Sequence, residues 1–320
     1  MAEECILLGF DVGGTKIGIG LGTGSGKILG SARIPNVDTY PEDILPQMVS
    51  ESKRLVAEAG LDISQVSAFG ISVPFPADAV NGIMTAPTNN KKWRNVPILS
   101  YLKKELGIPG CFENDANCAA LGEYYAGAGR GSRSLIGVTL GTGVGGGIII
   151  DNKVYSGFNH AGAELGHIVI EYDGVQCSCG RKGCWEAYSS ATALIRMTRE
   201  KIAEAGHSTK MWDMVGGNLD NVSGRTAFSA AKEGDKAAQE VVDKYIGYLT
   251  SGLASIINIF QPEVLSIGGG ISNEKDNLLN PIKERIKGET YSRDNIKATD
   301  IRIATLRNDA GIIGAAVLGR

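Results

Sequence analysis

The sequence predicts an α/β protein made of two similarly built domains, and three observations support this. The chain has 320 residues, of which 43% are hydrophobic and 21% charged, enough for two hydrophobic cores of about 150 residues each. Apolar stretches of strand length alternate with amphipathic stretches of helix length, which is typical of folds with parallel strands. Finally, a strand–turn–strand pattern near the N-terminus recurs about 130 residues later, as expected for an internal repeat.

The first part of the chain is expected to open with three strands over residues 5–34, joined by the turns DVGGTK and GTGSGK. Apolar spacing predicts a helix over 41–60 and a second helix over 98–107. Between these helices, residues 66–74 are expected to form a strand that runs into a proline-containing loop. A short strand over 111–117 then leads into another helix.

The second part repeats the opening arrangement. Placing Phe10 opposite Leu140 aligns the turn DVGGTK with GTGVGG, so residues 134–157 should again form strand, glycine turn, strand, polar turn and strand. The remaining expected elements are helices in 186–205 and 226–260, strands over 264–272 and 301–306, and a C-terminal helix rich in small residues.

Composition and charge disfavour several classes of function. The net charge is −3 without a basic block, so neither nucleic acid nor an anionic membrane is an expected partner. No apolar run reaches the roughly 20 residues that span a bilayer, and the acidic start Met1–Glu4 does not resemble a signal peptide. Scattered cysteines beside a metal-type cluster fit a reducing compartment, so the protein is expected to be cytoplasmic.

The most informative stretch runs from Asn159 to Glu186. It contains four soft ligands with the spacing His-x9-Cys-x-Cys-x4-Cys, namely His167, Cys177, Cys179 and Cys184. Imidazole and thiolates in this number are the usual ligands of a closed structural Zn²⁺ site, and Gly180 and Gly183 would let the loop turn tightly around the metal. The alternatives are a chance cluster of loop thiols or a reactive Cys-x-Cys pair. The carboxylates of Glu164 and Glu186 flank the cluster, which indicates a small polar ligand beside it.

Three glycine-rich turns each follow an apolar strand. They contain Asp11, Gly13, Gly14, Thr15 and Lys16; Thr142 and Gly143 within Gly141–Gly146; and Gly268, Gly269 and Gly270. Consecutive backbone N–H groups in such turns bind anions, and Asp11 can hold Mg²⁺ through water. Together the turns predict a nucleoside triphosphate site, although each alone could be a tight hairpin turn.

Two nucleotide motifs are set aside. Residues 141–146 match GxGxxG, but a dinucleotide site requires a helix next, and Ile148–Ile150 continue as a strand. The P-loop motif GxxxxGK[ST] is absent from the sequence.

Asp115, in the segment Glu113–Asn117, lies where a predicted strand ends and a helix begins. It suits the aspartate that accepts a hydroxyl proton during phosphoryl transfer, although an Asp or Asn there could also simply cap the helix.

The motifs DVGGTK, ENDAN, GTGVGGG, AELGH, CSCGRKGCWE and SIGGG, in this order, resemble the ROK family of sugar kinases and repressors, and most of all its glucokinases. The resemblance covers essentially the whole chain. It implies an actin-like (ribonuclease H-like) two-domain ATPase fold with an inter-domain cleft, and a homodimer. We expect an N-terminal domain over 1–117, a larger domain with the zinc loop over 118–307, and a helix over about 308–320 that packs back onto the first domain.

The resemblance also implies roles for individual residues. Asp115 would take the proton from the 6-hydroxyl of the sugar. The expected sugar-binding residues are Asn114, Glu164, His167 and Glu186, together with Asn89 or Asn90. His167 would bind zinc as well, with Cys177, Cys179 and Cys184. The first glycine turn, from Asp11 to Lys16, would face the phosphates and Mg²⁺ of ATP; Thr142 and Gly143 would join it; and Gly268–Gly270 would approach the adenosine.

The leading hypothesis is an ATP:hexose 6-phosphotransferase of the glucokinase type. Three positions depart from the family pattern: Phe75 stands where Gly-x-Pro-Gly has its second glycine, Thr88 interrupts the usual Pro-Asn-Leu, and Ala163 replaces a common glycine. Because the first two lie at the sugar pocket, a kinase for fructose, allose, N-acetylglucosamine or N-acetylmannosamine is the alternative. A sugar-responsive repressor is disfavoured, because DVGGTK begins at residue 11 and leaves no room for a helix-turn-helix domain.

Overall fold

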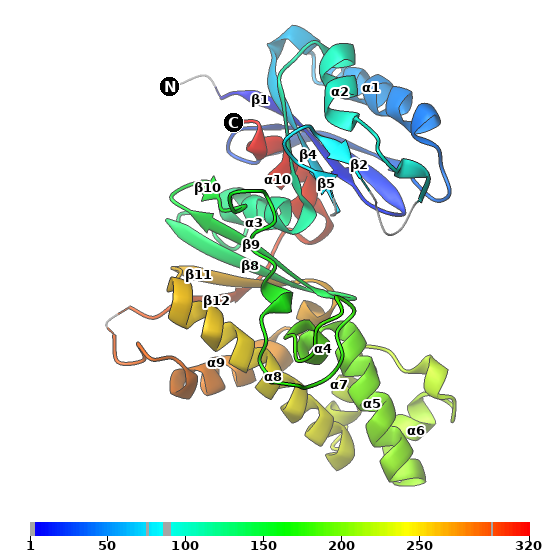
Figure 1. Ribbon diagram of the computed structural model, residues 1–320, viewed down its shortest axis with the longest axis vertical. Helices are drawn as coiled ribbons and strands as arrows, with labels where there is room; N and C mark the ends of the chain where they lie inside the picture. The colour runs from blue at the N-terminus through cyan, green and yellow to red at the C-terminus, as the bar shows by residue number, and fades with distance from the viewer. Residues whose placement is uncertain (1–3, 75–76, 86–90, 296) are drawn as a thin grey trace. The chain divides into compact units, whose positions relative to one another are not determined.

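A computed structural model describes residues 4–74, 77–85, 91–295 and 297–320 (Figure 1). The chain divides into two compact units. Unit 1 comprises Met1–Gly137, Gly147–Ala163 and Thr305–Arg320, and unit 2 comprises Val138–Gly146 and Glu164–Ala304. The domain boundary expected near residue 117 stays a prediction.

The first five-stranded sheet has the order β3-β2-β1-β4-β7. Its strands are β1 (Ile6–Val12), β2 (Lys16–Thr23), β3 (Ile28–Pro35), β4 (Val66–Val73) and β7 (Gly110–Asn114). The hairpins β1-β2 and β2-β3 are antiparallel, whereas β1, β4 and β7 run parallel. The three parallel strands therefore end at one edge, where Ser72 is in register with both Asp11 and Glu113.

The second five-stranded sheet has the order β10-β9-β8-β11-β12. Its strands are β8 (Ser134–Leu140), β9 (Val144–Ile150), β10 (Lys153–Val154), β11 (Val264–Gly268) and β12 (Asp300–Ile303). Taken in chain order, these strands occupy the same places as those of the first sheet, so the internal repeat is a repeat of topology. In each sheet the first two strands flank a glycine turn, at 13–14 and at 141–143.

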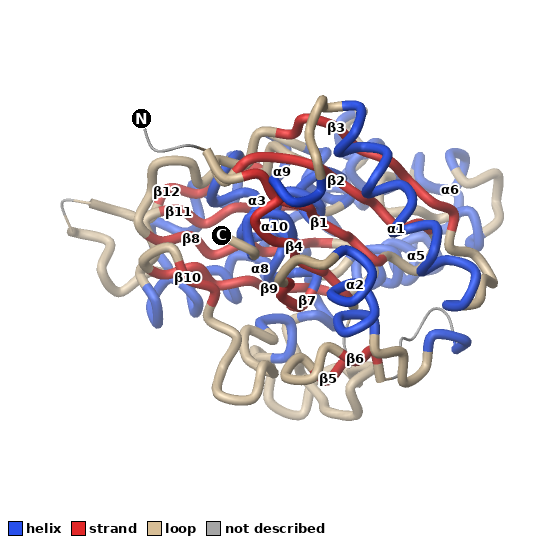
Figure 2. The backbone as a smooth tube through the Cα atoms, turned by 90° about the horizontal axis from the view of Figure 1, so that it is seen from above, coloured by secondary structure: helices blue, strands red, loops and turns tan. Residues whose placement is uncertain are grey.

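Helices cover both faces of the first sheet. They are α1 (Pro41–Glu58), α2 (Ile98–Leu106), α3 (Asp115–Ala126) and α10 (Ala310–Leu318). Apolar residues of α1 and α2 share a buried core with alternate residues of β1, β2 and β4, and α1 runs beside β2 and β3 (Figure 2). Helix α10 packs against β1, β4 and α3 within the same unit.

Unit 2 carries most of the remaining helices. They are α4 (Glu186–Ser189), α5 (Ala191–Ala205), α6 (Lys210–Met214), α7 (Thr226–Lys232), α8 (Lys236–Phe260) and α9 (Asp276–Glu289). The long helix α8 packs against α4, α5, α7 and α9 and buries an apolar stripe from Val241 to Ile257, as its amphipathic spacing predicts. Short strands β5 (Ala77–Asp78) and β6 (Ile83–Met84) form a separate two-stranded sheet.

Several elements differ from the expectation, including the short α6, β5 and β6, which were not expected. The strand expected over 264–272 ends at Gly268, because Gly269 has φ +84° and turns the chain into a 3₁₀ helix, Gly270–Glu274. Helix α9 was not expected from the sequence, since Pro281 within it and its few apolar residues weaken the helical pattern. Among the described helices, none is long and apolar enough to cross a membrane.

Small residues allow α10 to lie unusually close to α3 and the first sheet. A Cβ placed on Gly314 would lie 1.6 Å from the carbonyl oxygen of Cys118 in α3, and one on Gly122 would lie 2.3 Å from that of Ala310. Gly70 of β4 meets the carbonyl of Ala315 in the same way. The small-residue composition of the C-terminal helix is therefore a requirement of packing.

Gly314→Ala is expected to destabilise the protein by about 3 kcal/mol or more, because the added methyl group overlaps rigid backbone in a close-packed core. The measurement is the urea midpoint followed by circular dichroism. The matched control is Gly288→Ala, on the exposed face of α9, where an added Cβ meets nothing within 4 Å. The control should be neutral or slightly stabilising, since alanine favours helix. Equal midpoints for Gly314→Ala and the wild type would contradict this account of the packing.

Candidate active site and metal centre

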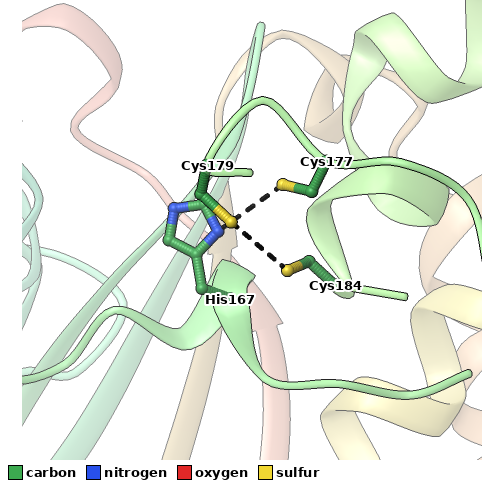
Figure 3. Close-up of side chains that lie close together, drawn as sticks. All are labelled: His167, Cys177, Cys179 and Cys184. Atoms are coloured by element: carbon green, nitrogen blue, oxygen red, sulfur yellow. Dashed lines mark hydrogen bonds between the residues drawn. The ribbon is translucent and has the colours of Figure 1, made fainter. Parts of the chain in front are cut away.

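Four side chains of unit 2 converge as the sequence predicted. The ligand atoms of His167, Cys177, Cys179 and Cys184 all lie within 4.8 Å of one another (Figure 3). Cys177 Sγ is 3.8 Å from His167 Nδ1, and Cys179 Sγ is 3.6 Å from Cys184 Sγ. Ligands bound tetrahedrally to Zn²⁺ are separated by about 3.5–3.8 Å. The cluster therefore fits a four-coordinate zinc ion with all positions taken by protein.

The loop around the cluster owes its shape to short backbone bonds and two glycines. The N–H of Cys177 donates to Arg181 O at 2.8 Å, and that of Gly180 donates to Cys177 O at 3.1 Å. Gly180 and Gly183 have φ of +90° and +78°, so the tight turns expected at both glycines are present. A Cβ on Gly183 would also lie 1.7 Å from Glu171 O, so only glycine fits there.

The thiols of the cluster differ in acidity. Burial raises the pKa of Cys184 to about 12, and its contacts with Cys179 and Cys177 add to this rise. The pKa of Cys179 is lowered, chiefly because its sulfur accepts a hydrogen bond from the backbone N–H of Arg181. A buried thiol that resists ionisation needs a strong positive charge beside it to become a thiolate, and a divalent metal supplies that charge.

Glu186 connects the zinc loop with the glycine turn of unit 2. Its Oε2 accepts a hydrogen bond from Val144 N at 3.0 Å, and its Oε1 accepts one from Ser178 Oγ at 3.2 Å. A Cβ on Gly143 would lie 2.3 Å from Glu186 Oε2, so glycine at 143 makes room for the carboxylate. Glu186 thus lies beside both predicted binding features of this unit.

The two glycine-rich segments of unit 2 lie side by side. A Cβ on Gly269 would lie 2.4 Å from the carbonyl oxygen of Leu140, just before Gly141. The start of α5 holds the first turn, because Thr192 Oγ1 donates to Thr142 O at 2.8 Å and Ala191 N donates to Gly141 O at 2.8 Å. The two segments, which contain Thr142, Gly143 and Gly268–Gly270, therefore lie close together in this unit. A nucleotide site built from both segments requires this proximity.

The glycine turn of unit 1 is a tight hairpin with a half-buried carboxylate at its start. Gly13 N donates to Lys16 O at 3.0 Å, and Asn36 Nδ2 donates to Gly13 O at 2.8 Å. The side chain of Asp11 accepts a hydrogen bond from Ser72 Oγ at 2.8 Å. Burial raises the pKa of Asp11, while Ser72 and Lys16 oppose that rise. Thr15 and Lys16 are exposed, so the turn presents a hydroxyl and an ammonium group beside a desolvated carboxylate.

Asn114 and Asp115 lie where β7 becomes α3. The side chain of Asn114 caps the helix, accepting from Ala116 N at 2.9 Å and from Asn117 N at 3.2 Å. Asp115 is exposed, and its Oδ1 accepts from Ala116 N at 2.8 Å. The residue that caps the helix through its side chain is therefore Asn114, and Asp115 follows it as the first helical residue, with its carboxylate close to the positive end of α3.

Glu113 is a functional candidate that sequence reasoning missed. Its side chain is 4% exposed; Oε1 accepts from Asn114 N at 2.8 Å and Asn117 Nδ2 at 3.1 Å, and Oε2 accepts from Ser156 Oγ at 2.5 Å. Glu113 therefore fixes the backbone from which Asp115 projects. The only signal in the sequence was a third acidic or amide residue beside the predicted base.

Comparison with known proteins places these features in a family. The family model described as "ROK family" matches residues 7–320. The chain belongs to the ROK family. Glucokinase from Thermotoga maritima is 37% identical over 315 residues, covering 97% of this chain and 96% of that protein. Among solved structures, a ROK family glucokinase from Streptomyces griseus in complex with glucose and AMPPNP is 34% identical, with a TM-score of 0.75 and 98% of both chains covered.

A ROK hexokinase from Thermus thermophilus is similar as well, with 30% identity, a TM-score of 0.81, and coverage of 98% of this chain and 97% of that one. These likenesses confirm the predicted family and the predicted α/β, actin-like two-domain fold of ROK sugar kinases. The predicted site residues are divided between the two units. Asp115, for example, belongs to unit 1, and Glu164 belongs to unit 2. Asn89 and Asn90, like the departures at Phe75 and Thr88, lie outside the described residues.

The third departure, Ala163, is described. Ala163 has φ +65°, in the left-handed region that disfavours a side chain and favours glycine. Directly after it, Glu164 opens the 3₁₀ turn Leu165–His167 and its carbonyl accepts from His167 N at 3.0 Å. The exposed carboxylate of Glu164 and the imidazole of His167 are thus held on one short turn.

Cys179→Ser is expected to lower the zinc content of the purified protein and to weaken glucose binding at least about tenfold, because metal binding is coupled to the folding of the loop that carries it. Zinc is measured by mass spectrometry, and glucose affinity by calorimetry. The matched control is Cys111→Ser, which removes an exposed thiol outside the cluster. A wild-type protein without zinc, or a mutant with unchanged zinc and unchanged affinity, would contradict the metal site.

Proposed function

We propose that this protein transfers the γ-phosphoryl group of ATP to the 6-hydroxyl of glucose, giving glucose 6-phosphate and ADP. The observation that carries the proposal is the full-length likeness to glucokinases, including one in complex with glucose and AMPPNP. The described residues support it independently. They supply a half-buried aspartate on the glycine hairpin of unit 1, a pair of glycine segments in unit 2, and an exposed aspartate at a helix start.

In the proposed reaction, Asp115 accepts the proton of the 6-hydroxyl as the oxygen attacks the γ-phosphorus, and the bond to the β-phosphate oxygen breaks. Phosphoryl transfer of this kind depends mainly on positioning and charge neutralisation, with one carboxylate to take the proton. Asp115 suits this role because its carboxylate is exposed and anchored to Ala116 N. The position near the start of α3 places this carboxylate at the positive end of the helix dipole.

The sugar would be held by Asn114, Glu164, His167 and Glu186, with Asn89 or Asn90 from outside the described residues. Carboxylates accept hydrogen bonds from hydroxyls, whereas amide and imidazole groups can also donate to them, so together these groups suit the ring of a hexose. Glu186 accepts from Val144 N through Oε2 and from Ser178 Oγ and the Cys177 thiol through Oε1, which leaves lone pairs for a sugar hydroxyl. The glucose preference rests on the relatives, and a kinase for another hexose or an N-acetyl amino sugar remains the alternative.

ATP would be bound by the glycine turns. Gly13, Gly14, Thr15 and Lys16 would contact its phosphates, joined by Thr142 and Gly143, while Gly268–Gly270 would lie near the adenosine. Mg²⁺, bound with the phosphates, would neutralise developing charge, and Asp11 would hold it through water. The partly desolvated position of Asp11 fits this role, since a desolvated carboxylate gains most from a cation.

The zinc ion is proposed to be structural, because all four positions are filled by His167 and the three cysteines. The same imidazole ring would contact the sugar, so the metal would act on substrate binding through His167. A homodimer, a cytoplasmic location and a place in glycolysis are further parts of the proposal, which rest on the family and on composition.

A coupled assay of ADP release tests the function. Wild-type protein with ATP and Mg²⁺ should turn over glucose faster than mannose, fructose, allose, N-acetylglucosamine or N-acetylmannosamine. Asp115→Ala should lose at least about a thousandfold in kcat and retain glucose affinity, since proton transfer and positioning are lost while the pocket remains. Asp213→Ala, which removes an exposed aspartate of α6, is the control. Normal turnover in Asp115→Ala would overturn the assignment, and a faster amino sugar would change the substrate.

Glu113→Gln is expected to lower kcat by about tenfold to a hundredfold with a smaller change in KM for glucose, because it disturbs the backbone that presents Asp115. Glutamine keeps the size but can accept through only one atom, so one of the bonds from Asn114 N, Asn117 or Ser156 is lost. Ser156→Ala, which removes one donor and leaves Glu113 charged, should have a milder effect of the same kind. If kcat stays at the wild-type value in both variants, Glu113 does not position the base.

A further inference from the structure

A hollow of about 710 Å³ lies in unit 1, outside the groups assigned to sugar, ATP and zinc. It runs along α3 and α10 beside the short strand β10. Part of its lining is apolar, from Leu121 of α3 and from Val317 and Leu318 of α10. This volume is within the range of small-molecule sites, which combine apolar walls with a few convergent polar groups.

One end of the hollow carries uncharged donors and acceptors around a buried carboxylate. Its lining includes Glu113, Ser156 and His160. Nδ1 of His160 is buried and has no hydrogen-bond partner among the described residues, which is costly for a polar atom. His160 also has φ +60°, and strain of this kind in a residue with a side chain is concentrated at functional positions.

Another part of the hollow is positively charged. Lys153 of β10 and Arg320 contribute to the lining, and the guanidinium carbon of Arg320 lies 5.2 Å from the ring centroid of Tyr125, in the last turn of α3. Glu113 lies before the first residue of that helix, so the cationic and the hydroxyl-binding parts are at different ends of α3. Among the lining side chains described, Glu113 is the one carboxylate, and it is already paired with Ser156.

We propose that this hollow binds a small phosphorylated sugar. The phosphate would be held by Lys153 and Arg320, since charge-assisted bonds from these side chains are the usual means of binding phosphate. The hydroxyls would meet Ser156, Glu113 and the unpartnered Nδ1 of His160, and the apolar face of the sugar ring would lie on Tyr125 and Leu121. The choice of a hexose phosphate as ligand rests on the proposed function, because such a molecule is that reaction's product.

A ligand in the hollow would affect the proposed base, Asp115, through Glu113. A ligand hydroxyl that bonds to Glu113 or Ser156 competes with the 2.5 Å bond between them. Glu113 in turn accepts from Asn114 N, the residue before Asp115. Binding therefore alters the support of the proposed base, and lowers kcat without competing with glucose.

The test is calorimetric titration of glucose 6-phosphate into the full-length protein saturated with glucose and AMPPNP, so that the proposed active site is occupied. One equivalent per chain is expected to bind. Lys153→Ala/Arg320→Ala should weaken this binding by about tenfold or more, because two charge-assisted contacts are lost. The matched control is Lys53→Ala/Arg130→Ala, which removes the same two charges from exposed positions outside the hollow.

Three results would overturn the proposal: no binding to the loaded protein, equal binding by both double variants, or binding of inorganic phosphate as tight as that of glucose 6-phosphate. In the kinetic arm, glucose 6-phosphate should lower kcat at saturating glucose in the wild type and the control, but not in Lys153→Ala/Arg320→Ala. Purely competitive inhibition would also overturn it. ADP release with glucose alone, measured on the same preparations, reports separately whether the proposed kinase function holds.

Discussion

The hydrogen bonds of Glu186 tie the metal centre of unit 2 to its glycine turn. One carboxylate oxygen accepts from Val144 N beside the turn, and the other accepts from Ser178 in the zinc loop. Gly143 leaves the space that this carboxylate occupies. The orientation of Glu186 thus depends on the loop between Cys177 and Cys184, whose ligand atoms lie close enough together to hold a metal ion. In this account, zinc organises substrate recognition without taking part in the reaction.

The repeated strand order places a glycine turn at the same position in each of the two sheets. Each five-stranded sheet begins with a hairpin whose turn is rich in glycine. In unit 1 the turn starts with a half-buried aspartate supported by Ser72, and in unit 2 the turn is supported by α5 and by Glu186. The same kind of glycine turn is therefore surrounded by different side chains in the two units. In the proposed function, the turn of unit 1 would bind a metal-bound phosphate, and the turn of unit 2 would contact a second phosphate and lie beside the sugar.

Much of the site could be predicted from the sequence because its signals are local. The zinc ligands lie within 18 residues of one another, the glycine turns follow apolar strands, and Asn114 and Asp115 show the composition of a helix start. The internal repeat predicted two similarly built domains, each opening with a strand–turn–strand pattern. These features depend on spacing along the chain, which sequence reasoning reads well.

Other features depend on contacts between distant segments and left no local signal. The bond between Ser72 and Asp11 spans 61 residues, and that between Ser156 and Glu113 spans 43. The early end of β11 follows from the positive φ of Gly269 against Leu140, and the close approach of α10 to α3 requires Gly314. A sequence shows that these residues are small or polar, but it does not show which carbonyl or carboxylate they face.

The central claim is that a zinc ion held by His167 and three cysteines fixes the sugar-binding side chains. The most direct measurement is glucose affinity by calorimetry before chelation, after chelation and after stoichiometric zinc is restored, with AMPPNP affinity measured on the same samples. We predict one zinc per chain, a loss of glucose affinity of about tenfold or more on removal, recovery on restoration, and little change for AMPPNP. Glucose binding that is unchanged in the metal-free protein would contradict the account.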